Sequence, residues 1–331
     1  MIKNISVIGD GGWGTTLAII LYRKGYKVNL WGAFEDYVGY LKKKRVNAKF
    51  LSGVKIPEGI LITNSLKEAV IGADLIILAV PSQYLRSVLI KLKIYNTPGK
   101  IFLSVVKGIE TATLKRMSEV VYDVLGKVKL AVLSGPTIAY EVARGIPTTV
   151  VVASRDLKLA KNLQDVLITD RFRVYTNKDI TGVELGGSLK NIIAIACGIS
   201  DGLRFGTNTK AAILARGLAE ITRLGVFLGA ESKTFSGISG LGDLVTTCIS
   251  PFSRNRFVGE QIGRGKKVKD ILKGMEMIAE GVPTAKSAYF LSRKLKVDMP
   301  IIKEIYMVLY KNKLPIKAVD DLMSRKRKSE F

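Results

Sequence analysis

The sequence predicts an α/β doubly wound sheet followed by an all-α C-terminal domain. Short apolar runs alternate with helical segments in the first half, which is typical of a parallel sheet covered by helices. A glycine-rich loop follows the first of these runs, and helical periodicity dominates from Gly182 onward. A chain of 331 residues is long enough for two domains. We expect them to span residues 1–182 and 183–331.

Six apolar runs in the first half predict buried strands, and the segments between them predict helices. The strands are expected at Lys3–Gly9, Lys27–Trp31, Asp74–Val80, Lys100–Val106, Leu130–Leu133 and Thr148–Ala153. The helices are expected at Thr15–Lys24, Ser65–Ile71, Gln83–Leu92, Thr113–Leu125 and Asp156–Leu167.

The second half shows helical periodicity and almost no strand pattern. Helices are expected at Leu185–Cys197, Thr209–Leu224, Arg254–Gly263, Val268–Lys273, Thr284–Leu295 and Pro300–Tyr310. The segment Ala211–Leu228 is rich in Ala, Leu and Ile, as a core helix should be. We find no apolar run near the roughly 20 residues of a spanning helix, and no signal-peptide core at the N-terminus. We therefore expect a cytoplasmic protein without stable membrane insertion.

The chain contains no histidine, which excludes a Ser-His-Asp triad and a His-bound zinc. Its two cysteines, Cys197 and Cys248, belong to no CxxC motif, so we expect no metal site and interpret both as small buried residues. Proton transfer must then use Lys, Asp, Glu, Tyr, Cys or water.

The net charge is +24, from 52 Lys and Arg against 28 Asp and Glu. This surplus fits a nucleic acid, a membrane or a phosphorylated small molecule, and a soluble Lys-rich surface explains it equally well. The Lys-rich segments lack the aromatic interleaving of a base-stacking surface, so we expect no nucleic-acid partner. The basic run Arg325–Lys328 is interpreted as a solvated tail.

The segment Gly9-Asp10-Gly11-Gly12-Trp13-Gly14 matches the G-x-G-x-x-G pattern between an expected strand and an expected helix. In that context Gly9 permits the turn, Gly11 lets a pyrophosphate approach and Gly14 allows close packing of helix on strand. We therefore predict a dinucleotide site at the N-terminus of the helix. Gly32-Ala33, after the second strand, offers neither an acid for NAD nor an arginine for NADP. Glu35 and Asp36 lie slightly farther along the chain than the acid that binds the ribose 2′-hydroxyl. The basic residues 42–45 remain candidates for binding a 2′-phosphate.

Polar residues also gather where strands end and helices begin. Lys107 and the segment Leu133–Thr137 follow expected strands, at the edge where open α/β sheets bind ligands. Asp243 lies between glycines, where it either binds a ligand or caps the helix that follows. Segment 253–256 (SRNR) suits a phosphate, although Ser253 is also a natural N-cap. Lys190 lies on an otherwise apolar helix, and burial would lower its pKa towards the range of proton transfer.

At these residues the chain resembles the NAD(P)-dependent glycerol-3-phosphate dehydrogenases of bacterial type. The segments GDGGWGTTLA, VKGIE, LSGPT, LGGSLKNIIAIACGISDG, ARGLAE, SGLGDLVTTC, SRNR and EG follow the family's order and approximate spacing over nearly the whole chain. The resemblance implies a Rossmann-like N-terminal domain, a helical C-terminal domain and a homodimer. It also implies that the chain reduces dihydroxyacetone phosphate to sn-glycerol 3-phosphate for glycerophospholipid synthesis.

The resemblance assigns roles position by position. Lys190 matches the family's proton acceptor, and Lys107 and Asp243 assist it. The positions that match substrate contacts are Lys107, Gly135, Thr137, Lys190, Asp243, Ser253, Arg254 and Asn255. Those that match cofactor contacts, beside Gly9, Gly11 and Gly14 of the loop, are Gly12, Trp13, Lys107, Ala139, Arg254, Ile278 and Glu280. Ala33 replaces the basic or polar residue of many relatives, so NAD and NADP both stay open.

Two other functions compete with this interpretation. A different dehydrogenase of the same architecture, acting on another phosphorylated or acidic carbonyl compound, would share the glycine loop. It would not be expected to carry both GLGDL and SRN. A basic nucleic-acid-binding protein with a vestigial dinucleotide fold is suggested only by the charge.

Overall fold

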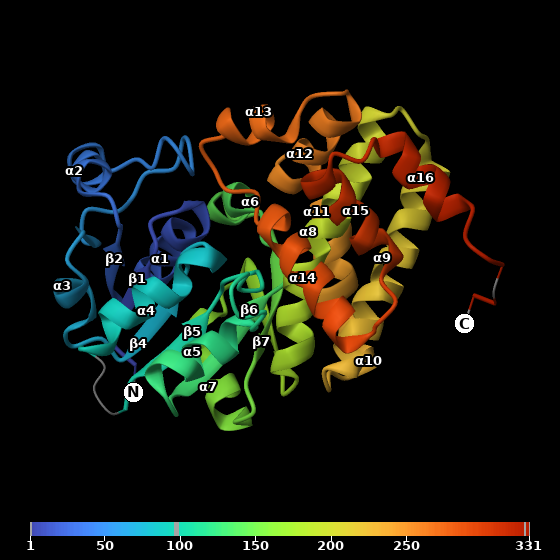
Figure 1. Cartoon of the computed structure of the whole chain (residues 1–331). Coiled ribbons are helices and arrows are strands. Elements are labelled where there is room, and N and C mark those ends of the chain that lie inside the picture. Colours follow the sequence, from blue (N-terminus) through green and yellow to red (C-terminus); the bar gives the residue numbers. More distant parts are fainter. Residues whose placement is uncertain (1, 96–98, 328, 331) are drawn as a thin grey trace.

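A single mixed sheet organises the first half of the chain in the computed structural model, which describes residues 2–95, 99–327, 329 and 330. In this described part the sheet has eight strands in the order β3-β2-β1-β4-β5-β6-β7-β8 (Figure 1). This order extends the usual doubly wound arrangement by two strands. The strands are β1 (Asn4–Ile8), β2 (Lys27–Trp31), β3 (Leu61–Thr63), β4 (Leu75–Leu78), β5 (Ile101–Ser104), β6 (Lys129–Ser134), β7 (Thr148–Ala153) and β8 (Phe172–Asn177).

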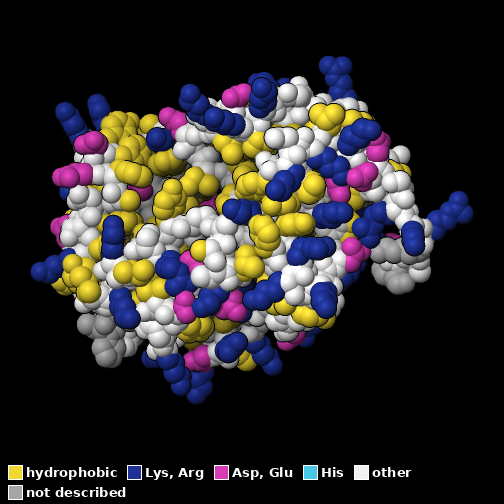
Figure 2. All heavy atoms as spheres, in the orientation of Figure 1, with side chains coloured by type: hydrophobic (Ala, Val, Ile, Leu, Met, Phe, Trp, Pro, Cys, Tyr) yellow, Lys and Arg dark blue, Asp and Glu magenta, His cyan; other side chains and the backbone are white. Residues whose placement is uncertain are grey.

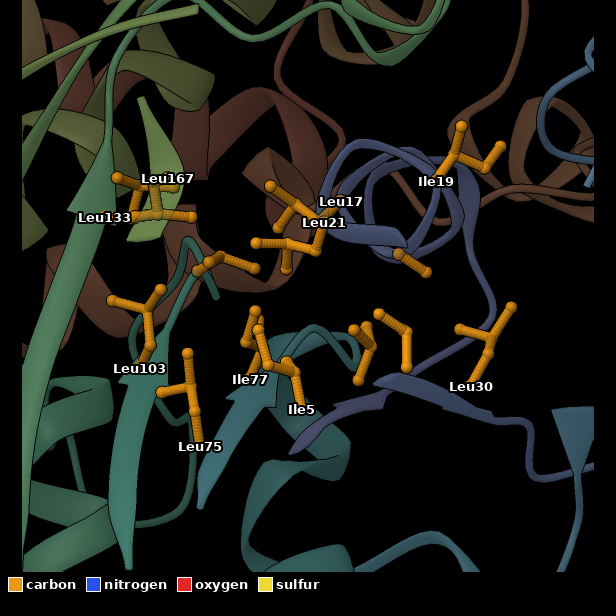
Figure 3. Close-up of a cluster of buried hydrophobic side chains, with 14 of the residues drawn as sticks. Ile5, Leu17, Ile19, Leu21, Leu30, Leu75, Ile77, Leu103, Leu133 and Leu167 are labelled. Atoms are coloured by element: carbon orange, nitrogen blue, oxygen red, sulfur yellow. The ribbon is translucent and has the colours of Figure 1, made fainter. Parts of the chain in front are cut away.

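Helices cover both faces of the sheet. A core cluster under α1 (Gly12–Arg23), α2 (Glu35–Lys44), α6 (Ala139–Ala143) and α7 (Leu157–Leu167) fills one face. A second cluster under α3 (Leu66–Val70), α4 (Leu85–Lys93) and α5 (Met117–Leu125) fills the other. In Figure 3, Leu17 and Leu21 of α1 point towards the sheet, and Ile77 and Leu103 of the strands point towards the helix. The predicted doubly wound fold is therefore confirmed.

The second lobe is helical, as predicted, and its helices lie beside the sheet domain (Figure 1). Its elements are α8 (Ile180–Gly202), α9 (Thr207–Phe227), α10 (Ser232–Phe235), a π-helical turn η2 (Ile238–Gly242), α11 (Asp243–Ile249), α12 (Arg254–Gly263), α13 (Val268–Lys273), α14 (Gly281–Leu295), α15 (Pro300–Lys311) and α16 (Pro315–Met323). The expected division at 182/183 falls in the first turn of α8 and stays a prediction.

Two strands, β7 and β8, run against the predicted parallel direction. β7 pairs antiparallel with β6, whereas β8 pairs parallel with β7. The reason lies in the connection from β6 to β7, whose only helix, α6, has five residues. At about 1.5 Å per residue such a helix spans roughly 8 Å, too little to carry the chain back along a six-residue strand of about 20 Å.

Other differences concern short or weakly patterned elements. The sequence analysis missed the three-residue strand β3, the edge strand β8 and helices α2, α6, α10 and α16. Helix α5 begins at Met117 rather than near Thr113, because Arg116 and Glu119 form a capping box there. Leu114, just before that box, adopts a left-handed backbone with φ 61° and cannot lie in a helix.

Helix α8 is the central helix of the second lobe and corrects the expectation about apolar segments. Its 23 residues are long and apolar enough to cross a membrane, but its most apolar stretch is completely buried inside the protein. Helix α8 contacts α9, α11, α12, α14 and α15, and it also reaches strand β6. We therefore interpret it as a core helix. The glycines and Lys190 within it concealed the length of the apolar segment.

Helix α9 differs from the core helix that its composition predicts. Five of its 21 residues are buried, and they share one face: Gly217, Glu220, Ile221, Leu224 and Gly225. Apolar side chains at its C-terminal end remain exposed, with Phe227 at 59%.

Basic residues are spread over the surface. Figure 2 shows Lys and Arg side chains around the whole visible face, interspersed with acidic ones. In the basic tail, Arg325 pairs with Asp298 at 2.7 Å, and Lys328 lies outside the described residues.

We predict that Leu17→Ala lowers the free energy of unfolding of the sheet domain by about 2–5 kcal/mol, because Leu17 lies on the fully buried face of α1, against the sheet. Both tryptophans, Trp13 and Trp31, lie in this domain, so urea unfolding followed by tryptophan fluorescence measures it. Ile90→Ala, at a 57% exposed position, is the control and should change stability by less than about 0.5 kcal/mol. Equal effects of the two substitutions would contradict the packing described here.

Candidate active site

The predicted site residues gather at one edge of the sheet. Strands β1, β4, β5 and β6 run parallel, and their carboxyl ends are level, with Ile8 opposite Leu78 and Leu78 opposite Ser104. The glycine loop follows β1, Lys107 follows β5, and Gly135 follows β6. This is the edge at which open α/β sheets bind their ligands.

Asp243 joins two lysines from the two lobes. Lys107 Nζ lies 2.8 Å from Asp243 Oδ2, and Lys190 Nζ donates to Asp243 Oδ1. Asp243 is fully buried, so both cations compensate a carboxylate that has left water. The helix-cap interpretation of Asp243 is wrong, since it lies within α11 and its carboxylate binds the lysines instead. Lys107 pairs with this carboxylate instead of extending into solvent.

The remaining bonds of the two ammonium groups fix their directions. Lys107 Nζ donates to Gly135 O at 2.9 Å and to Thr137 Oγ1 at 3.2 Å. Lys190 Nζ donates to Thr247 Oγ1 at 2.8 Å, and Thr247 in turn donates to the Asp243 carbonyl. We refer to Lys107, Lys190, Asp243, Thr137 and Thr247 as the lysine cluster. Sequence analysis missed Thr247, although its position four residues after Asp243 places it on the same helix face.

Burial brings the pKa of Lys190 close to neutral. The residue is 5% exposed, and desolvation lowers the pKa of its ammonium group to about 7. The Asp243 carboxylate opposes this shift and Lys107 reinforces it. A group with a pKa near 7 can both give and accept a proton at neutral pH.

Small residues and a π-helical turn make this cluster possible. A Cβ atom on Gly187 would lie 2.3 Å from Ser134 Oγ, and one on Gly186 would lie 2.5 Å from Ser239 O. Helix α8 therefore approaches both strand β6 and turn η2 closely. Turn η2 leads directly into Asp243. Such π turns occur often at functional sites because they redirect a side chain.

A second chain of hydrogen bonds begins at Asn191, the residue after Lys190. Asn255 Nδ2 donates to Asn191 Oδ1 at 2.9 Å, and Gly281 N donates to Asn255 Oδ1 at 2.8 Å. The neighbouring Glu280 accepts from Ser82 N at 2.9 Å and from the Ser82 hydroxyl. These contacts connect α12 and α14 to the loop after β4, so they tie the two lobes together.

The N-terminus of α12 carries the predicted phosphate residues. Ser253 Oγ accepts from Arg256 N at 3.2 Å, so it is an N-cap, the second of its two interpretations. Asn255 is buried in the chain just described, whereas Arg254 is exposed. Arg254 lines a hollow between the lobes with Lys49, Phe257 and Met277. Ile278, 39% exposed, follows this hollow in the loop before Glu280.

The glycine loop fits a dinucleotide. Gly9 has φ 128°, and a Cβ atom there would lie 2.6 Å from Ala79 O. A Cβ atom on Gly14 would collide with Gly9 O, whereas one on Gly11 would meet nothing within 4 Å. The loop is therefore open on the side of Gly11, where the free N–H groups of α1 begin.

Two other residues predicted to bind the cofactor lie around this loop. Ala139 begins α6, and its carbonyl accepts from Thr16 Oγ1 at 3.2 Å. Trp13 instead packs its ring on Phe172, with ring centroids 6.3 Å apart. The backbone of Trp13 lies in the first turn of α1, which begins at Gly12. Sequence analysis did not foresee Phe50, whose carbonyl lies over Gly12.

Comparison with known proteins identifies the family of the chain. Family models described as the N-terminus and the C-terminus of NAD-dependent glycerol-3-phosphate dehydrogenase match residues 4–160 and 179–320. Relatives named glycerol-3-phosphate dehydrogenase (NAD(P)+) are 49% identical over 330 residues in Chlorobium limicola and 51% identical over 327 residues in a Thermoanaerobacter species. These alignments cover 99% of this chain in both cases, and 99% and 98% of the relatives.

Among solved structures, the chain is similar to a glycerol-3-phosphate dehydrogenase from Coxiella burnetii, with a TM-score of 0.95 and 38% identity. That alignment covers 98% of this chain and 99% of the other. A yeast glycerol-3-phosphate dehydrogenase has a TM-score of 0.83 at 28% identity, over 98% of this chain and 100% of that one. With both family models matched and with relatives about half identical over its length, the chain belongs to the NAD-dependent glycerol-3-phosphate dehydrogenase family.

Proposed function

We propose that the protein is an NAD(P)-dependent glycerol-3-phosphate dehydrogenase that reduces dihydroxyacetone phosphate to sn-glycerol 3-phosphate, reversibly. Family membership over the whole chain supports this activity. The observation that carries the mechanism is the buried Lys190, held by Asp243 at the carboxyl edge of the sheet. The product would supply the backbone of glycerophospholipids.

Lys190 is the proposed proton donor and acceptor. When bound, the nicotinamide cofactor supplies or takes up the hydride at the central carbon of the substrate. As negative charge develops on the carbonyl oxygen, protonated Lys190 gives its proton to that oxygen, and in the reverse direction neutral Lys190 accepts one. Lys107 stabilises the same oxygen electrostatically, and Asp243 holds both cations in place.

The remaining site residues are proposed to bind the substrate and the cofactor. Arg254 would grip the substrate phosphate at the N-terminus of α12, with Ser253 and Asn255 shaping that terminus, and Gly135 and Thr137 would complete the substrate contacts. The glycine loop would hold the pyrophosphate, and Ala139, Ile278 and Glu280 would line the cofactor site. Either NAD or NADP is compatible with the names of the relatives.

We also infer a cytoplasmic homodimer. The half-exposed face of α9 supports self-association, because its apolar residues Val226 and Phe227 are 48% and 59% exposed. Two free, buried cysteines suit a reducing compartment.

The activity is tested by following the absorbance of NADH or NADPH at about 340 nm as it is oxidised. Each nucleotide is assayed with dihydroxyacetone phosphate and with unphosphorylated dihydroxyacetone. We expect turnover with the phosphorylated ketone alone. Lys190→Ala should lower kcat by about 100- to 10,000-fold, the usual contribution of a general acid, while NADH binding is retained. Lys233→Ala, at a highly exposed lysine, is the matched control. Near-normal turnover of Lys190→Ala would defeat the assignment.

The rate should depend on pH in opposite senses in the two directions. Because burial lowers the pKa of Lys190 to about 7, the protonated donor is present below pH 7 and disappears above it. The kcat/KM for ketone reduction should therefore fall as pH rises through 7, and that for alcohol oxidation should rise over the same interval. Flat profiles between about pH 6 and 9 in both directions would be inconsistent with a lysine of this pKa.

A further inference from the structure

The carboxylate of Asp10, in the glycine loop, lies at the end of the second strand. A Cβ atom on Gly32 would be 2.3 Å from Asp10 Oδ2 and 2.7 Å from Asp10 Cγ, so the carboxylate lies directly against the Gly32 backbone. The register of the sheet explains this contact. Ile8 pairs with Trp31, and Gly9 N donates to Trp31 O at 2.9 Å, so the residues that follow each strand are neighbours.

This oxygen is buried and unused. Among the residues that the structure describes, Asp10 Oδ2 has no hydrogen-bond partner, although almost none of its surface reaches solvent. A buried carboxylate oxygen without a donor is costly, and such groups call for a ligand or another explanation. The loop around it is fixed, because Asn47 Nδ2 donates both to the Asp10 carbonyl and to Thr15 Oγ1, each at 2.7 Å. The backbone that carries the carboxylate is therefore fixed. Asp10 as a whole is only partly buried, so an incoming donor can approach its side chain.

The Asp10 carboxylate lies where the adenosine ribose of a bound dinucleotide is expected. In sheets of this type, an acidic residue at the end of the second strand accepts a hydrogen bond from the 2′-hydroxyl of the adenosine ribose. Here the second strand is followed by Gly32 and Ala33, which have no such group. Asp10 brings a carboxylate to the same place from the neighbouring loop, and Gly32 leaves the room for it.

The basic residues that could hold a 2′-phosphate are directed elsewhere. Arg45 donates to Ile60 O at 2.8 Å and pairs with Glu58 at 3.2 Å. The three lysines 42–44 lie in the last turn of α2, about 10 Å along the helix from its first residue. The first turn of α2, next to the strand end, carries the acidic residues Glu35 and Asp36. A 2′-phosphate would thus meet acidic groups.

We propose that the Asp10 carboxylate accepts a hydrogen bond from the adenosine 2′-hydroxyl of the bound dinucleotide and makes this chain select NAD(H) over NADP(H). The inference rests on the proposed function and narrows its cofactor class. NADPH, which carries a phosphate in place of that hydroxyl, would lose the hydrogen bond and place its charge against the carboxylate. A hydrogen bond to a charged group at this point corresponds to about 10- to 100-fold in affinity.

Direct binding tests the proposal without turnover. The dissociation constants of NADH and NADPH are measured by titrating the purified protein and following nucleotide fluorescence. We expect the wild-type protein to bind NADH at least about tenfold more tightly than NADPH. Asp10→Ala and Asp10→Asn should reduce this ratio by about tenfold, through weaker NADH binding and unchanged or tighter NADPH binding. Asp320→Asn, at an exposed acidic residue on α16 of the helical lobe, is the matched control and should leave the ratio unchanged.

Three results would overturn the proposal: equal affinity of the wild-type protein for both nucleotides, an unchanged ratio in both Asp10 variants, or a loss in Asp320→Asn equal to that in Asp10→Ala. The wild-type ratio decides the matter even where a variant does not fold. Failure of the wild-type protein to bind either nucleotide would instead contradict the proposed function, and with it this inference.

Discussion

The fully buried carboxylate of Asp243 is the group on which the rest of the site depends. It pairs with Lys107 of the sheet domain and with Lys190 of the helical lobe, so one side chain fixes two cations from different parts of the chain. Removing one partner of such a buried pair costs about 3–5 kcal/mol, because the other charge is left without compensation. The three groups therefore require each other. Their common requirement also explains how Lys190 can stay buried on an otherwise apolar helix.

The two lobes are held by further contacts at the same junction. Glu184 on α8 accepts from Ser118 N at 2.7 Å and pairs with Arg116 at 2.6 Å, which attaches α8 to the start of α5. Glu280 and Ser82 make a second connection between the lobes. The Glu184 contacts fix α8, the helix that carries Lys190, against the sheet domain. The chemistry proposed for Lys190 is thus a consequence of how two separately patterned halves meet.

Local pattern predicted much of this arrangement. The apolar runs identified the central strands, with β2 and β7 at the expected bounds, and helices α12 and α13 also begin and end where expected. The antiparallel direction of β7 was not predictable from its own residues, since it depends on the short α6 before it. Helix α9 was wrongly placed in the core, because composition alone does not say whether a neighbour covers an apolar face.

In the site as well, individual residues were predictable from the sequence, whereas their contacts were not. Lys190 stood out because a lysine in an apolar helix needs a partner, and Lys107 and Asp243 stood out at strand and helix ends. Their pairing required the fold, as did the interlobe bond between Ser82 and Glu280. Asp10 gave no signal beyond the x position of a glycine motif, because its role depends on the register between β1 and β2.

The pH profile of Asp243→Asn tests the central claim most directly. In the wild-type protein, the Asp243 carboxylate raises the pKa of Lys190 against the larger effect of burial. Without that charge, the pKa that governs ketone reduction should fall by about one to three units below its wild-type value, so activity declines from a lower pH. Circular dichroism and NADH binding confirm that the variant is folded. A folded Asp243→Asn variant with normal turnover and the wild-type pH profile would contradict the account.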